Sequence, residues 1–181
     1  MKIIIVGTDI NEGISVAKAL QDMNDDLQIA PVFTTDLTMR GKTAEAYYYM
    51  SHEEIELSYR NNAFMWVRTT PSVTNGVTMG DMYTSNIFAM TYGDFNNISN
   101  PVFNELYNNN DNECLILVLD NTNTKKKEED LLEAKCAYER IYNNEYLYFL
   151  NSTITEVAEY VLKYIASNEE ERKLLADALN N

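Results

Sequence analysis

The chain contains few of the residues from which many common functional sites are built. Its 181 residues include one histidine, two cysteines, three prolines and six glycines. With His52 as the single histidine, a His-rich metal site is excluded, and we expect His52 to be a solvated residue in the first turn of a helix. Cys114 lies in an apolar strand pattern and Cys136, far from it, in a helical pattern, so we expect two reduced, buried thiols and no disulfide scaffold.

Long apolar runs are also missing. No run approaches the roughly 20 residues needed to span a bilayer, and the N-terminus has neither the basic start nor the cleavage site of a signal peptide. We therefore expect a cytoplasmic protein with no membrane partner. Hydrophobic residues still make up 45% of the chain, which suits one well-buried domain spanning residues 1–181.

Positive charge is scarce. Lysine and arginine total 14 against 28 aspartates and glutamates, so the formal net charge is -14. Such a field repels a nucleic-acid backbone, and we expect no direct nucleic-acid binding. The tight basic cluster Lys125–Lys127 is followed at once by the acidic residues 128–130. The acidic surface can serve solubility alone, or it can bind a protein partner with a basic surface.

The first residues have the strand–loop–helix layout of a phosphate-binding loop without its lysine. The β-branched run Ile3–Val6 leads into Gly7, a short polar loop follows, and we predict a helix from Gly13 to Met23. This layout directs backbone N–H groups and a helix N-terminus at a phosphate. The missing cation makes phosphoryl transfer doubtful as the function.

Strands and helices alternate through the rest of the chain. Ser51 with Glu54, and Thr153 with Glu156, have the spacing of capping boxes, and Asn75-Gly76 predicts a hairpin turn. The alternation predicts a three-layer α/β fold, with a central, mostly parallel sheet and helices on both faces. The predicted strands are 27–33, 46–50, 63–67, 86–91, 114–120 and 146–150. The predicted helices are one starting at residue 51, one over 96–107 interrupted by Pro101, and others over 127–142, 153–165 and 167–181.

The order of segments resembles the P-loop nucleoside monophosphate kinases, guanylate kinase in particular, from Met1 to about Ala166. The family's loop GxSGxGKST is matched by Gly7–Ser15, and its helix ending AKAL is matched by residues 17–20. The resemblance implies a P-loop-kinase-like fold with a nucleotide-binding excursion at 36–80 and a shortened lid at 121–135. It also implies a degenerate nucleotide-binding loop with four candidate residues, Gly7, Gly13, Ser15 and Lys18.

Several family residues are replaced. The loop lysine falls on Gly13 or Ile14, and the arginine that follows the threonine pair is Asp36. Trp66 stands where the family has a guanine-reading glutamate, and Tyr47 matches its phosphate-contacting tyrosine. Exposed residues among Tyr47–Tyr49 and Trp66 would form a stacking pocket for a base or an anchor for a protein partner. The candidate substrate-region residues are Thr35, Arg40, Tyr47, Trp66 and Asp94, and Asp120 is a further candidate at a strand end.

These replacements predict a catalytically degenerate guanylate-kinase-like protein that binds a host or viral protein partner or a nucleotide. Compactness, an Asn- and Tyr-rich composition and the loss of a housekeeping active site together suggest that a virus or phage encodes it. No metal or cofactor is expected for that function, and in an infected cell the compartment is the host cytoplasm. One alternative is an active (deoxy)nucleoside monophosphate kinase that uses ATP and magnesium. Its relocated cations would be drawn from Lys18, Arg40, Lys42, Arg68 and Lys125–Lys127. A second alternative is an acidic, DNA-mimicking inhibitor of a nucleic-acid-binding protein.

Overall fold

The first strand is apolar on both faces and therefore occupies the middle of a sheet. In the computed structural model, which describes residues 1–41, 46–108, 113–121 and 128–180, Ile3 and Ile5 belong to one buried cluster. Ile4 and Val6 belong to another on the opposite face, as the two-residue period of a strand requires. Such a strand needs layers on both of its sides.

The larger sheet is wholly parallel, with the strand order β6-β1-β7-β8. Its strands are β1 (Lys2–Gly7), β6 (Ile87–Thr91), β7 (Cys114–Asp120) and β8 (Tyr146–Leu150). Each strand lies inside or closely overlaps a predicted one. All but the last residue of β7 are buried, as expected of a parallel strand covered on both faces.

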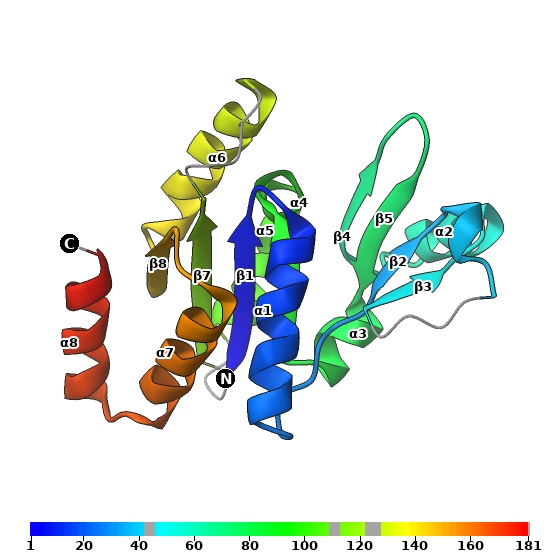
Figure 1. Ribbon diagram of the computed structural model, residues 1–181. Coiled ribbons are helices and arrows are strands. Elements are labelled where there is room, and N and C mark those ends of the chain that lie inside the picture. The colour runs from blue at the N-terminus through cyan, green and yellow to red at the C-terminus, as the bar shows by residue number, and fades with distance from the viewer. Residues whose placement is uncertain (42–45, 109–112, 122–127, 181) are drawn as a thin grey trace.

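Helices cover both faces of this sheet (Figure 1). On one face lie α1 (Ile10–Met23) and α7 (Ile154–Ala166), which contact each other. On the other face lie α4 (Tyr92–Asn96), α5 (Asn100–Asn108) and α6 (Glu128–Ile141). The last helix, α8 (Glu169–Asn180), lies beside β8. The predicted α/β architecture is confirmed. Within the described ranges, no helix is both long and apolar enough to cross a membrane.

A second, mixed sheet stands on the side of α1 and α4 that is remote from α8 (Figure 1). Its order is β3-β2-β5-β4, in which β5 runs antiparallel to both of its neighbours. Most of this sheet falls in the excursion predicted for residues 36–80. Its strands are β2 (Val32–Thr34), β3 (Tyr47–Tyr49), β4 (Phe64–Thr69) and β5 (Thr74–Thr78), and its helices are η1 (Leu37–Met39), α2 (His52–Arg60) and α3 (Met79–Thr84).

Two local predictions are confirmed and one is wrong. Both predicted capping boxes are present, at the starts of α2 and α7. The predicted turn at Asn75-Gly76 is wrong, because both residues lie inside β5. The chain turns at residues 70–73 instead, where the Thr70 N–H donates to the Val73 carbonyl oxygen at 2.8 Å. Gly76 is needed for packing, since an added Cβ would lie 2.5 Å from the Trp66 carbonyl oxygen.

Other sequence predictions need correction. The helix predicted over 96–107 corresponds to α5, which begins only at Asn100. Pro101 does not interrupt it, because it lies in the first turn, where a missing N–H does no harm. The strand predicted over 27–33 is reduced to β2. Cys114 is buried as predicted, but Cys136 is exposed on α6. Its helix has only a narrow buried face, and Tyr142 just beyond it is also exposed.

Candidate functional site

The connection between β1 and α1 is too short to be a phosphate-binding loop. Only Thr8 and Asp9 separate the last residue of β1 from Ile10, where the helix begins. The prediction that Gly13 opens the helix is therefore wrong by three residues. Asp9 caps the helix, and its Oδ1 accepts hydrogen bonds from the Asn11 N–H at 2.9 Å and from Asn11 Nδ2 at 3.1 Å. A carboxylate thus takes up a helix N-terminal donor of the kind that binds phosphate.

Three of the predicted loop residues lie along α1 instead. Gly13 is buried against β6, and a Cβ at this position would lie 3.2 Å from the Cβ of Ala89. The Ser15 hydroxyl donates to the Asn11 carbonyl oxygen one turn earlier, at 2.8 Å. Lys18 is half-buried and lies eight residues after the start of the helix, about 12 Å along its axis. The structure does not bring these side chains together with Gly7.

Arg68 connects the second sheet to the carboxyl edge of the central sheet. It projects from β4, and its Nη2 lies 2.9 Å from Glu133 Oε1 on α6. Its Nη1 donates to Thr91 Oγ1 at 3.3 Å, and the same atom lies 3.9 Å from Asp94 Oδ1 on α4. One guanidinium therefore contacts the end of β6, α4 and α6.

Asp94 is held in place by the start of α4. Its Oδ2 accepts hydrogen bonds from the Thr91 N–H at 3.1 Å and the Thr91 hydroxyl at 2.7 Å, which completes a capping box. Only 5% of Asp94 is exposed. Burial raises the pKa of this carboxyl, while the Thr91 hydrogen bonds and the Arg68 charge act in the opposite direction.

Gly93 makes room for the Arg68–Glu133 pair. A Cβ at this position would lie 2.5 Å from both Arg68 Nη1 and Glu133 Oε2. Any larger residue would force these two side chains to move. The backbone at the start of α4 is therefore part of the cluster that Arg68 forms with Thr91, Asp94 and Glu133.

The cavity beside this cluster is too small for a nucleotide. Its volume is about 40 Å³, enough for a water molecule or two, whereas ligand pockets commonly measure about 300–1,000 Å³. Its lining residues are Gly7, Thr8, Arg68, Thr91, Tyr92 and Glu133.

The carboxyl edge of the central sheet is acidic. Burial raises the pKa of Glu12 on α1, and the nearby carboxylates of Asp9 and Asp120 raise it further. The pKa of the Tyr47 hydroxyl is also raised by burial, then by Asp9 and Asp94. Asp120 accepts a hydrogen bond from the Tyr148 hydroxyl at 2.6 Å. In the part of the chain that the structure describes, no group of three or more His, Cys, Asp or Glu side chains could hold a metal ion.

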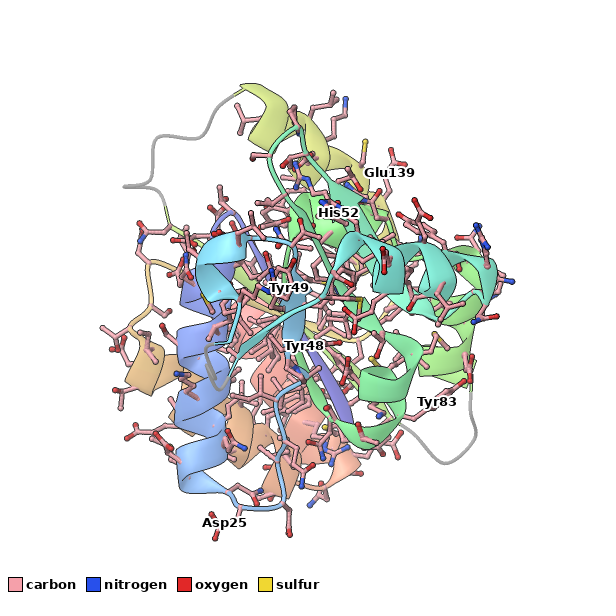
Figure 2. All side chains as sticks on the ribbon, turned by 90° about the vertical axis from the view of Figure 1, so that its right-hand side faces the viewer. Asp25, Tyr48, Tyr49, His52, Tyr83 and Glu139 are labelled. Carbon is pink, nitrogen blue, oxygen red and sulfur yellow. The ribbon has the colours of Figure 1, made fainter. Side chains whose placement is uncertain are left out.

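Two of the predicted substrate-region residues have structural partners in the second sheet. The Thr35 hydroxyl accepts a hydrogen bond from the Thr74 N–H at 2.8 Å and so joins the end of β2 to β5. The Arg40 guanidinium lies 5.9 Å from the centre of the Tyr49 ring. Figure 2 shows Tyr49 on β3 and the predicted surface residue His52 on α2, which is exposed.

Trp66 and Tyr47 face the interior between the two sheets. Trp66 is only 2% exposed and belongs to the hydrophobic cluster of the central sheet, so it is not one of the exposed aromatic residues available for stacking or for anchoring a partner. Its Nε1–H has no acceptor among the described residues. Tyr47 is half-buried and packs against a small cluster that contains Ile14 and Ala89.

Sequence reasoning named Asp94 and, as one of several cations, Arg68, but it missed Thr91, Gly93 and Glu133. The spacing of Thr91 and Asp94 is that of a capping box and would have indicated both α4 and its cap. No local signal marks Glu133. The proposed cations Lys42 and Lys125–Lys127 lie outside the described residues.

Comparison with known proteins gives a structural likeness only. Neither the protein-family profiles nor the curated protein sequences match this chain. Among solved structures, the guanylate kinase from Anaplasma phagocytophilum superposes with a TM-score of 0.53 and 14% sequence identity. The alignment covers 90% of this chain and 82% of that kinase. The chain therefore has a guanylate-kinase-like fold.

Proposed function

We propose that this chain is a catalytically degenerate guanylate-kinase-like protein that acts by binding a protein partner and does not transfer phosphate efficiently. The observation that carries the proposal is the two-residue connection between β1 and α1, capped by the Asp9 carboxylate. A nucleotide tail placed there would meet the negative charge of Asp9, which already accepts the Asn11 N–H at the helix start.

The arrangement of cations supports the same conclusion. Phosphoryl transfer depends on positioning and on positive charge around the transferred group, and a single arginine can contribute about 10³-fold or more in rate. Arg68 supplies positive charge at this edge, but Glu133 and Asp94 already bind it. Lys18 lies two turns into α1. Arg68 lies beside Gly7 and Thr8, but its charge is already paired, which argues against a role as a substitute for the loop lysine.

The expected partner has a basic surface. The chain has a formal net charge of -14, and carboxylates gather at the edge where an active relative would hold an anionic nucleotide. Complementary charge would speed association and favour a basic partner over an acidic one. A virus or phage source, which the composition suggested, would place that partner in the infected host.

A coupled assay with ATP, magnesium and each common nucleoside and deoxynucleoside monophosphate tests the loss of catalysis, with an active guanylate kinase as the positive control. We expect turnover below about 1 s⁻¹, the lower end of ordinary kinase rates. We also expect no nucleotide to raise the thermal unfolding midpoint, because a ligand that binds only the native state must raise it. Turnover above that rate, abolished by Lys18→Ala, would contradict the proposal and favour relocated cations.

A further inference from the structure

A larger cavity lies between the second sheet and the corner that joins α4 to α5. Its volume is about 480 Å³, within the range of binding pockets. One wall is Phe64–Val67 of β4, and the other includes Asn97, Ser99 and Pro101. We call this cavity the β4 slot. It is separate from the small cavity beside Arg68, with which it shares no lining residue.

The slot runs along the edge strand β4. All four consecutive residues Phe64–Val67 line the cavity, so it extends along this strand. β4 is the outermost strand in the order β3-β2-β5-β4 and pairs only with β5 within the described residues. An edge strand presents backbone N–H and C=O groups that another strand can bind.

The slot wall on β4 lacks the usual protection of an edge strand. Natural edges often carry lysine or proline that blocks pairing with another chain, whereas Phe64–Val67 has neither. A bulge between Phe64 and Trp66 interrupts the register with β5, and the corner between α4 and α5 faces the strand, but the slot lies between the two. The ring of Tyr59 on α2, 49% exposed, packs edge-on against Phe64 at 5.0 Å. An apolar side chain would bury surface here.

Two carboxylates lie one helical turn from residues that line the slot. Glu56 lies one helical turn before Tyr59, and α2 has three glutamates against one arginine, Arg60. On α5, Glu105 lies one turn after Val102, another lining residue. It accepts a hydrogen bond from the hydroxyl of Tyr83 on α3; Figure 2 labels Tyr83. A segment with lysine or arginine on both sides of an uncharged stretch would complement this arrangement.

We propose that the β4 slot binds an extended segment of a protein partner, which adds as a strand to the edge of β4 and has basic residues on both sides of an uncharged centre. Main-chain hydrogen bonds would provide affinity, and side chains that enter the slot would provide specificity. This inference rests on the proposed partner-binding function and names the surface and the partner's chemistry.

Trp66 is the chain's single tryptophan. It is one of the residues that line the slot and only 2% exposed, so we expect a strand bound along β4 to change the surroundings of its indole and hence its fluorescence. The probe is a synthetic heptapeptide with lysine at each end and alternating valine and threonine between. We expect a saturable change in the fluorescence of the full chain. The same peptide with its internal amides N-methylated cannot pair as a strand and should give no change. A glutamate-ended peptide should bind at least tenfold more weakly at low salt, and less so at high salt.

A blocked slot provides the matched control. Asn97 is exposed and lines the slot, so Asn97→Tyr should fill it and weaken binding at least tenfold. Asn143 is exposed on the turn after α6, away from the slot, and Asn143→Tyr should bind the peptide like the unaltered chain. Thermal unfolding of both variants checks that each is folded.

Amide chemical shifts of the unaltered chain provide a second measurement that needs no variant. Peptide addition should perturb Phe64–Val67 and residues 99–102 first. Absence of a fluorescence change, equal binding of the N-methylated peptide, or perturbations centred elsewhere would overturn the proposal. The kinase assay distinguishes this proposal from the proposed function. A chain that is inactive as a kinase and does not bind the peptide would contradict only the slot proposal. A chain that is active as a kinase would contradict the proposed function.

Discussion

Arg68 and Glu133 are 65 residues apart in the sequence, yet Arg68 Nη2 lies 2.9 Å from Glu133 Oε1. The pair joins β4 of the second sheet to α6 of the central sheet. The same guanidinium also contacts Thr91 and lies 3.9 Å from the buried Asp94 carboxylate. The relative position of the two sheets therefore depends partly on one side chain.

Loss of Arg68 should cost more stability than loss of Glu133. The Arg68 and Glu133 side chains are 38% and 30% exposed, so solvent screens their pairing, and Glu133→Gln should cost no more than about 1 kcal/mol. Arg68→Ala also leaves Asp94 buried without its cation, and we expect a loss of about 1–3 kcal/mol at neutral pH. Urea denaturation measures both. Arg60→Ala, at the exposed end of α2, is the control and should have little effect. Equal losses for Arg68→Ala and Glu133→Gln would contradict the role given to Asp94.

Gly93→Ala should separate Arg68 from Glu133. Its Cβ would lie 2.5 Å from the end of each side chain. Both ends are flexible and can move aside, so the loss should not exceed the value of the ion pair, about 1 kcal/mol. Gly80→Ala is the matched control, because its Cβ would meet only Thr78 Oγ1, at 3.6 Å. Gly80 lies in α3, where alanine should be neutral or stabilising by up to about 1 kcal/mol. If the clash with the ion pair causes the loss, the cost of Gly93→Ala should shrink in an Arg68→Ala background.

Asp9 should act as a helix cap whose removal does not create a nucleotide site. Asp9→Ala removes the acceptor for the Asn11 N–H and should cost about 1 kcal/mol of unfolding free energy. Asp9→Asn retains an oxygen acceptor and should cost less. Neither variant lengthens the connection between β1 and α1, so neither should give a nucleotide-dependent rise in the thermal midpoint. If a nucleotide raised the thermal midpoint of Asp9→Asn but not that of the unaltered chain, the charge of Asp9, and not the length of the connection, would be what excludes the nucleotide.

Local signals predicted much of the fold, but contacts between distant segments decided the site. Thr153 and Glu156 form their capping box because both residues belong to one helical turn. Asn75-Gly76 has an equally local turn signal, yet β5 continues through it because Gly76 must fit against Phe33 and Trp66. The partnership of Arg68 with Glu133 depends on how two sheets meet. A single sequence contains no local pattern for that arrangement.

The pH dependence of stability should distinguish Asp94 from an exposed capping carboxylate. Burial raises the pKa of Asp94, so the native state holds this proton to higher pH than the unfolded chain does. Its contribution to stability is therefore complete below the ordinary aspartate pKa and is lost as the pH rises through the raised value. The unfolding free energy of the unaltered chain minus that of Asp94→Asn should fall as the pH rises between about 3 and 7.

Glu54 is the matched control, because its contribution to stability should change with pH in the opposite direction. Hydrogen bonds from the Ser51 hydroxyl and backbone N–H lower the pKa of this exposed carboxyl. Its contribution is present above the ordinary glutamate pKa and is lost as the pH falls through the lowered value. The corresponding difference for Glu54→Gln should therefore rise with pH over the acidic part of the same range. Urea denaturation at a series of pH values measures both differences. If both differences rise with pH, the Arg68 charge outweighs burial, and the pKa of Asp94 in the native state is lowered and not raised.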